Sequence, residues 1–64
     1  MNNNYVTKMV KTAQILSTMR GRTWLMSNGK ELYVAETEDI MESKRDVWNF
    51  WVAAIYENGW KVEA

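Results

Sequence analysis

The chain contains no cysteine, no histidine and no proline among its 64 residues. Without cysteine there are no disulfides, and without cysteine and histidine there are no metal sites with sulfur or nitrogen ligands. Catalytic triads, thiolate chemistry and imidazole proton transfer are excluded for the same reason. Glu38, Asp39 and Glu42 lie close together in the sequence, but acids in a first helical turn ordinarily interact with the helix dipole. We therefore expect no catalytic residue, no metal and no cofactor.

Long hydrophobic runs are also absent. The N-terminal sequence MNNNYVTKMVK has no apolar run that could serve as a signal peptide, and no stretch approaches the length that crosses a membrane. We therefore expect a cytoplasmic protein, and the start at Met1 suggests a complete small gene product. A glycine-rich phosphate loop is absent too, because RGR and SNGK each contain one glycine and are typical of turns.

Apolar residues make up 47% of the chain, which is typical of a folded protein. A chain of this length buries only about 60% of its unfolded surface, so its core is marginal unless something reinforces it. Aromatic packing or a second chain must supply that reinforcement here. Three of the four tryptophans lie between residues 48 and 60, and we expect them to hold the core.

The first segment has the apolar spacing of an amphipathic helix. The run Asn2–Asn4 offers caps for its start, and Gly21 suits its end. The β-branched residues in this segment favour a strand at about residues 12–19 as the alternative. The apolar residues that share one face of the helix are Tyr5, Val6, Met9, Val10, Ala13, Leu16 and Met19.

The sequence TWLMSNGKELYVAE predicts a β-hairpin. Asn28 and Gly29 between two alternating apolar runs are typical of a type I′ turn, in which both central residues have positive φ. Such a turn pairs Ser27 with Lys30 and continues in that register. Both faces of the hairpin are apolar, so one helix layer is not enough to cover them. One face carries Leu25, Leu32 and Val34, and the other carries Trp24, Met26 and Tyr33.

The rest of the chain predicts a long C-terminal helix. Thr37 before Glu38 is typical of a helix start, and Ser43 with Asp46 forms a second capping signal. We therefore expect a short turn over 38–42 and a main helix from about residue 44, with one continuous helix over 38–58 as the alternative. In the two-part arrangement Lys44 lies near a helix end, where its side chain can reach solvent.

The sequence ENGW is typical of a helix end. Gly59 suits the left-handed residue after the last turn, and Trp60 then folds back near Ile55; KVEA could form a short closing strand. Phe50 and Val52 widen the apolar face of the helix beyond what one sheet covers. This excess of apolar surface predicts a partner, most simply a second copy of the chain.

These elements together predict a single small α+β domain over residues 1–64. It has an N-terminal helix, a central β-hairpin that can extend to a three-stranded antiparallel sheet, and a long C-terminal helix packed on the sheet.

The net charge of zero hides a division along the chain. Residues 1–30 carry five basic and no acidic residues, whereas residues 31–64 carry eight acidic and three basic ones. Such asymmetry indicates an interaction surface, unless the two halves lie together and neutralise each other. The acidic run suits a basic site on another protein and contains Glu31, Glu36, Glu38, Asp39 and Glu42.

Nucleic-acid binding is the main alternative. The basic half could contact phosphates, and Trp24 and Tyr33 could stack on bases. The zero net charge and a pI near 6.2 argue against it. The basic residues concerned are Lys8, Lys11, Arg20, Arg22 and Lys30.

The order NGKELYVAETED, a helix and then ENGW resembles the layout of some small phage-encoded inhibitors, including anti-CRISPR proteins and inhibitors of host RNA polymerase. The resemblance covers residues 28–60 and rests on element order and turn residues. It implies a compact α+β protein that inhibits a host protein by binding it. It assigns no individual binding residue, and the basic first half departs from the acidic pattern of these inhibitors.

We therefore predict a non-enzymatic protein-binding module that forms a homodimer. A nucleic-acid-binding or regulatory protein is the alternative, and a purely structural homo-oligomer is a third interpretation. The binding surfaces expected are the acidic run and an apolar set made of Trp24, Met26, Tyr33, Phe50 and Val52.

Overall fold

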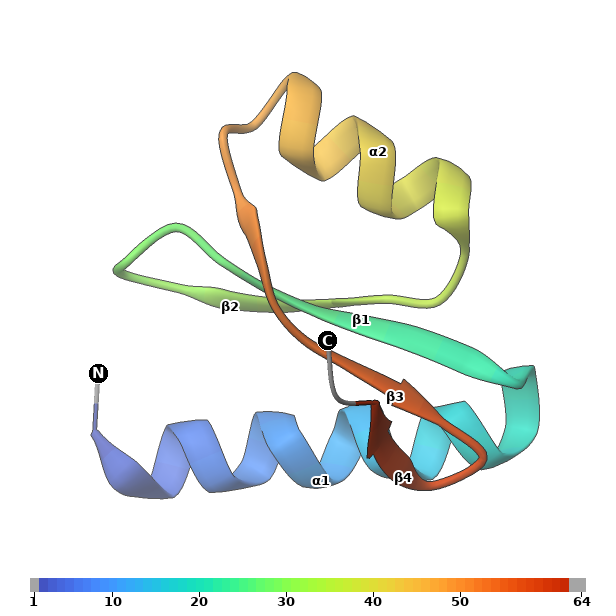
Figure 1. The fold of residues 1–64 in the computed structure, drawn as a ribbon. Coiled ribbons are helices and arrows are strands. Elements are labelled where there is room, and N and C mark those ends of the chain that lie inside the picture. The colour runs from blue at the N-terminus through green and yellow to red at the C-terminus, as the bar shows by residue number, and fades with distance from the viewer. Residues whose placement is uncertain (1, 63–64) are drawn as a thin grey trace.

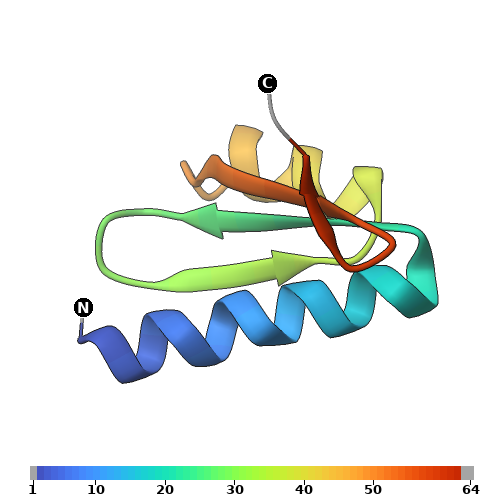
Figure 2. The same cartoon turned by 60° about the horizontal axis from the view of Figure 1, so that its bottom comes forward.

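The computed structural model describes residues 2–62, which fold into two helices and four strands (Figure 1). The strands form one antiparallel sheet in the order β2-β1-β3-β4. In Figures 1 and 2, α1 lies against one face of this sheet and α2 lies on the opposite side. The predicted small α+β domain is confirmed. The elements are α1 (Asn3–Arg20), β1 (Arg22–Ser27), β2 (Leu32–Ala35), α2 (Glu38–Asp46), β3 (Trp51–Glu57) and β4 (Trp60–Val62).

Helix α1 begins and ends where the sequence predicts. The Asn2 side chain accepts a hydrogen bond from the Tyr5 N–H at 2.8 Å. At the other end Gly21 has a φ of 92° and donates its N–H to the Ser17 carbonyl. The alternative strand over 12–19 is wrong. Thr12 fits within the helix because its hydroxyl group donates to a carbonyl one turn earlier, at 2.8 Å.

Strands β1 and β2 form the predicted hairpin, but their register differs by two residues. Ser27 pairs with Leu32, so residues 28–31 form a four-residue loop and the predicted two-residue type I′ turn is wrong. Asn28 is not in the left-handed region; its side chain accepts the N–H groups of the two residues that close the loop, at 2.9 and 2.7 Å. Because the shift is an even number of residues, every side chain keeps its predicted face.

The two faces of the hairpin lie in two separate cores. The core on the α1 side contains buried Ala13, Leu25 and Tyr56, packed against Met9, Val10, Leu32, Val34 and Ala54. The core on the α2 side contains buried Trp24, Met26 and Ala35, packed against Tyr33, Ile40, Met41, Phe50 and Ile55. The second apolar face of the hairpin is thus covered by α2 and Phe50 of the same chain, and Ile55 of β3 extends this face.

The predicted long C-terminal helix is wrong, both as two parts and as one continuous helix. Thr37 caps α2 as expected, accepting the Ile40 N–H at 3.2 Å, but the helix ends at Asp46. Asn49 then takes a left-handed conformation (φ 60°), and residues 51–57 run as the strand β3 beside β1. Pairing with β1 decides this outcome, because a central strand without a second neighbour would leave its backbone groups unpaired.

The predicted helix end at Gly59 is a second hairpin instead. Asn58 and Gly59 have φ values of 50° and 88° between the paired residues Glu57 and Trp60, which is the geometry of a type I′ turn. Trp60 is therefore the first residue of β4, and the predicted C-terminal helix onto which it would fold back is absent from residues 51–62. The predicted closing strand is confirmed for residues 61–62, while residues 63–64 lie outside the described part of the chain.

Candidate functional site

Three of the four tryptophans lie on the surface, so the prediction that the cluster at 48–60 holds the core is wrong. Trp24 is the buried one. Trp48, Trp51 and Trp60 are 61%, 53% and 79% exposed, respectively. Large apolar surface that folding leaves open is a recognised sign of an interaction site.

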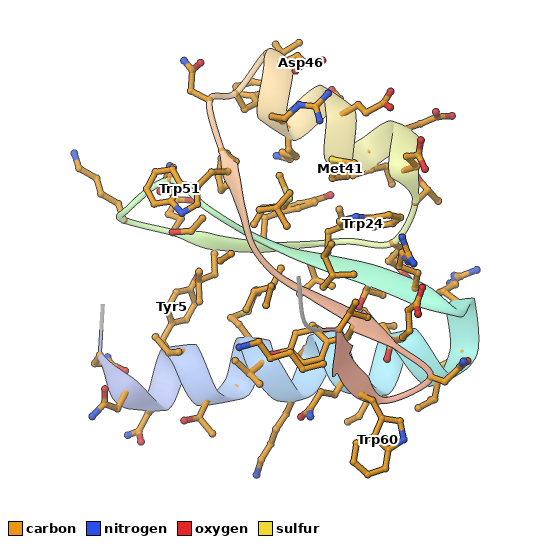
Figure 3. All side chains as sticks on the ribbon, viewed as in Figure 1. Tyr5, Trp24, Met41, Asp46, Trp51 and Trp60 are labelled. Carbon is orange, nitrogen blue, oxygen red and sulfur yellow. The ribbon has the colours of Figure 1, made fainter. Side chains whose placement is uncertain are left out.

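Two of these tryptophans lie in the stretch of chain where α2 ends and β3 begins. We define the tryptophan corner as Val47, Trp48, Trp51 and Val52, all of them exposed. The ring of Trp51 reaches the β1–β2 loop, since its Cη2 lies 3.5 Å from where a Cβ on Gly29 would stand. Figure 3 shows Trp51 beside that loop, whereas Trp60 lies elsewhere, next to α1. Trp60 is therefore not part of the corner.

A cationic side chain lies among the aromatic rings next to this corner. The Lys44 Nζ is 4.1 Å from the centroid of the Tyr33 ring, 5.3 Å from that of Trp48 and 5.4 Å from that of Phe50. Tyr33 and Phe50 meet edge to face, with centroids 6.5 Å apart. The three distances from Lys44 Nζ to the ring centroids all fall within the range of cation–π attraction. We call Tyr33, Trp48 and Phe50 the ring cluster.

The structure divides the predicted acidic run. Glu38, Asp39 and Glu42 lie together on α2 and are exposed, whereas Glu36 pairs with Arg20 at 3.2 Å. Glu31 lies in the β1–β2 loop, at the opposite end of β2 from Glu36 and roughly 15 Å away along the strand. Only the part of the acidic run on α2 therefore forms a single patch.

Two residues that are neighbours in the sequence, Arg45 and Asp46, form an ion pair in the last turn of α2. Arg45 Nε donates to Asp46 Oδ1 at 2.9 Å, and this hydrogen bond lowers the pKa of the Asp46 carboxyl while it raises the pKa of Arg45. Asp46 therefore stays ionised well below neutral pH, beside the tryptophan corner.

The basic residues of the first half do not form one patch. Arg20 pairs with Glu36, and Arg22 pairs with Glu57, so two of the five predicted phosphate contacts are bonded to acids of the second half. Those pairs match the interpretation that the halves neutralise each other. The other three are exposed, Lys8 and Lys11 on α1 and Lys30 in the β1–β2 loop.

The predicted apolar set also divides between core and surface. Trp24 and Met26 are buried beneath α2, at 7% and 0% exposure, so in this structure they are not open to a partner or to a nucleic-acid base. Tyr33 and Phe50 are half-buried in the ring cluster, and Val52 is exposed. Sequence reasoning missed the exposure of Trp48 and Trp51, because it placed both on the buried face of a helix.

Residues 2–62 contain no group of histidine, cysteine or acidic residues arranged to hold a metal ion. Neither helix in this part of the chain has the length and apolarity needed to cross a membrane. Comparison of the chain with protein-family models, curated proteins and solved structures found no match.

Proposed function

We propose that the chain is a non-enzymatic protein-binding module and that the tryptophan corner is its binding surface. The observation that carries the proposal is the exposure of Trp48 and Trp51, three residues apart in the sequence, in a domain whose two cores contain neither of them. Exposed tryptophan is unfavourable in water, and tryptophan is enriched among residues that dominate binding energy in protein interfaces.

The charge around the corner indicates the character of the partner. Glu38, Asp39 and Glu42 are exposed on α2, the helix that leads into the corner. A partner that offers an apolar patch bordered by lysine or arginine would match both features, and charge complementarity of this kind speeds association and favours the correct partner. A small inhibitor that occupies a basic site of a cytoplasmic host protein is one form of this function.

A double variant tests the proposal directly. Trp48→Ser with Trp51→Ser removes both rings of the corner, and Trp60→Ser removes an even more exposed ring elsewhere. We expect the immobilised double variant to lose the partner that wild type captures from a host lysate, while the Trp60→Ser control keeps it. Both variants should retain their circular dichroism spectra, because these tryptophans lie outside the two cores.

Two outcomes would contradict the proposal. If the double variant captures the same partner as wild type, the corner is not the binding surface. If wild type instead binds a nonspecific oligonucleotide with an affinity that falls steeply as salt is added, and Lys8→Ala with Lys11→Ala abolishes that binding, the nucleic-acid alternative replaces it.

A further inference from the structure

The ring cluster has the geometry of a site for an alkylammonium group. Three aromatic rings from two parts of the chain converge on one ammonium nitrogen: Tyr33 from β2, and Trp48 and Phe50 from the segment between α2 and β3. A single ring over a lysine is common, whereas several rings around one nitrogen characterise sites that bind quaternary ammonium groups. The ion that occupies the cluster here belongs to the chain itself.

Lys44 is held by these rings and by no acid among residues 2–62, where the ion pairs are Arg20–Glu36, Arg22–Glu57 and Arg45–Asp46. Its side chain has four rotatable carbons and extends from the last turn of α2. Trp48, one wall of the cluster, is more than half exposed, so the cluster is open to solvent on that side. Lys44 can therefore leave the cluster without breaking an ion pair of residues 2–62.

We propose that the ring cluster is a binding site for an alkylammonium side chain of the partner, a lysine or methylated lysine, and that Lys44 occupies this site in the free protein. The inference rests on the proposed function and deepens it, because it names the group on the partner that the ring cluster receives beside the tryptophan corner. Glu38, Asp39 and Glu42 on the same helix attract a cation toward the cluster. Lys44 then acts as an internal competitor that lowers the affinity for the incoming cation.

Removal of the competitor tests the inference. We expect Lys44→Ala to bind N-acetyl-trimethyllysine amide roughly two- to thirtyfold more tightly than wild type does, which is the factor that one cation–π interaction contributes. Tryptophan fluorescence and chemical shifts of the Tyr33, Trp48 and Phe50 rings would report the binding. Lys30→Ala, which removes a lysine from the β1–β2 loop, should leave the wild-type affinity unchanged.

The recognition of charge needs its own control. Neutral 3,3-dimethylbutanol has the shape of choline without the charge, and Lys44→Ala should bind choline but not this alcohol. Equal binding of the two would overturn the inference, since it would show a merely apolar site. Binding of choline without binding of the lysine derivative would overturn the assignment to a partner side chain.

Failure of the fold is separated from failure of the inference by a second variant. Lys44→Met keeps the length of the side chain and removes its charge, so it preserves packing against the rings. If the folded Lys44→Ala variant binds no alkylammonium probe, the inference is overturned, whereas Lys44→Met should bind the probe less tightly than Lys44→Ala because methionine still packs among the rings. The proposed function is tested independently, because Trp51→Ser should weaken partner capture while it leaves the ring cluster intact.

Discussion

The hydroxyl group of Tyr5 joins the first helix to the edge of the sheet. It donates to the Leu32 carbonyl at 3.2 Å and accepts the Leu32 N–H at 3.0 Å. Leu32 lies on β2, which has a neighbouring strand on one side only. Unpaired backbone groups on an edge strand are a template for pairing with other chains, and one side chain from α1 occupies a pair of them here.

At this scale, Tyr5→Phe tests the contact. We expect the variant to lose about 1 kcal/mol of unfolding free energy, because it removes one hydroxyl group that forms two hydrogen bonds with β2. Urea denaturation would measure the loss. Tyr56→Phe is the matched control, since it removes a hydroxyl group from β3 and not from this edge. A Tyr5→Phe variant as stable as wild type would show that water replaces both hydrogen bonds at no cost.

At the scale of elements, the chain uses the dipeptide Asn-Gly twice with different results. Asn58 and Gly59 form the tight type I′ turn between β3 and β4. Asn28 and Gly29 begin a four-residue loop, because the Asn28 side chain accepts the loop N–H groups. The turn at Gly59 is also held by α1, since the Gly59 N–H donates a hydrogen bond to Ser17 Oγ at 2.8 Å.

A pair of glycine substitutions tests this contact between the β3–β4 turn and α1. Gly59→Ala places a Cβ 3.1 Å from Thr18 Cγ2, whereas Gly29→Ala places one at an ordinary 3.5 Å from Trp51. Both glycines have a φ near 90°, so each substitution carries a similar backbone cost of about 1–2 kcal/mol. We expect Gly59→Ala to be the more destabilising in urea denaturation, and Thr18→Ser, which removes the close methyl group, to abolish this extra loss of stability. Equal losses in an unchanged Thr18 background would contradict the close contact.

The elements that the sequence predicts correctly are those with local signals. Helix α1 has a cap at Asn2, an apolar face and a terminating Gly21, and the hairpin has two alternating runs around Asn28. Residues 51–57 have no such single signal. Trp51, Ala54 and Ile55 are spaced as one face of a helix, while residues 51–56 also form the continuous apolar run of a strand buried on both faces, and pairing with β1 selects the strand. The spacing of apolar residues alone could not decide between a helix and a strand, because the contacts that decide come from residues distant in the sequence.

The same ambiguity explains the error in the site. On a helix, Trp48 and Trp51 lie one turn apart on the buried side. The helix in fact ends before Trp48, and Asn49 turns the chain into β3, which leaves both rings exposed. A left-handed asparagine within VWNFW was the available clue, since asparagine adopts this conformation more readily than most residues. The acidic residues of α2 could be predicted, because Thr37 marks the start of that helix.

For the molecule as a whole, the position of α2 changes the basis for expecting a homodimer. A second copy was expected to cover the face that carries Trp24 and Met26, and α2 covers that face within one chain. A dimer formed through the tryptophan corner would instead join two complete domains. Such a dimer would contribute little to the folding of each copy.

This distinction predicts how unfolding depends on concentration. We expect the urea midpoint to stay constant over a hundredfold range of protein concentration, because each chain completes both of its cores. Light scattering at high concentration should show any dimer, and Trp48→Ser with Trp51→Ser should abolish it. A midpoint that rises with concentration would show instead that folding requires the second copy.

Strand β1 lies at the centre of the sheet, but its two neighbours come from different distances along the chain. Leu25 pairs with Val34 in the adjacent strand and with Ala54, about 30 residues further on. Closing the longer loop makes this pairing the slower step of folding. During folding, α1 and the first hairpin can therefore form early, whereas Trp24 and Met26 stay open to aggregation until β3 has paired with β1.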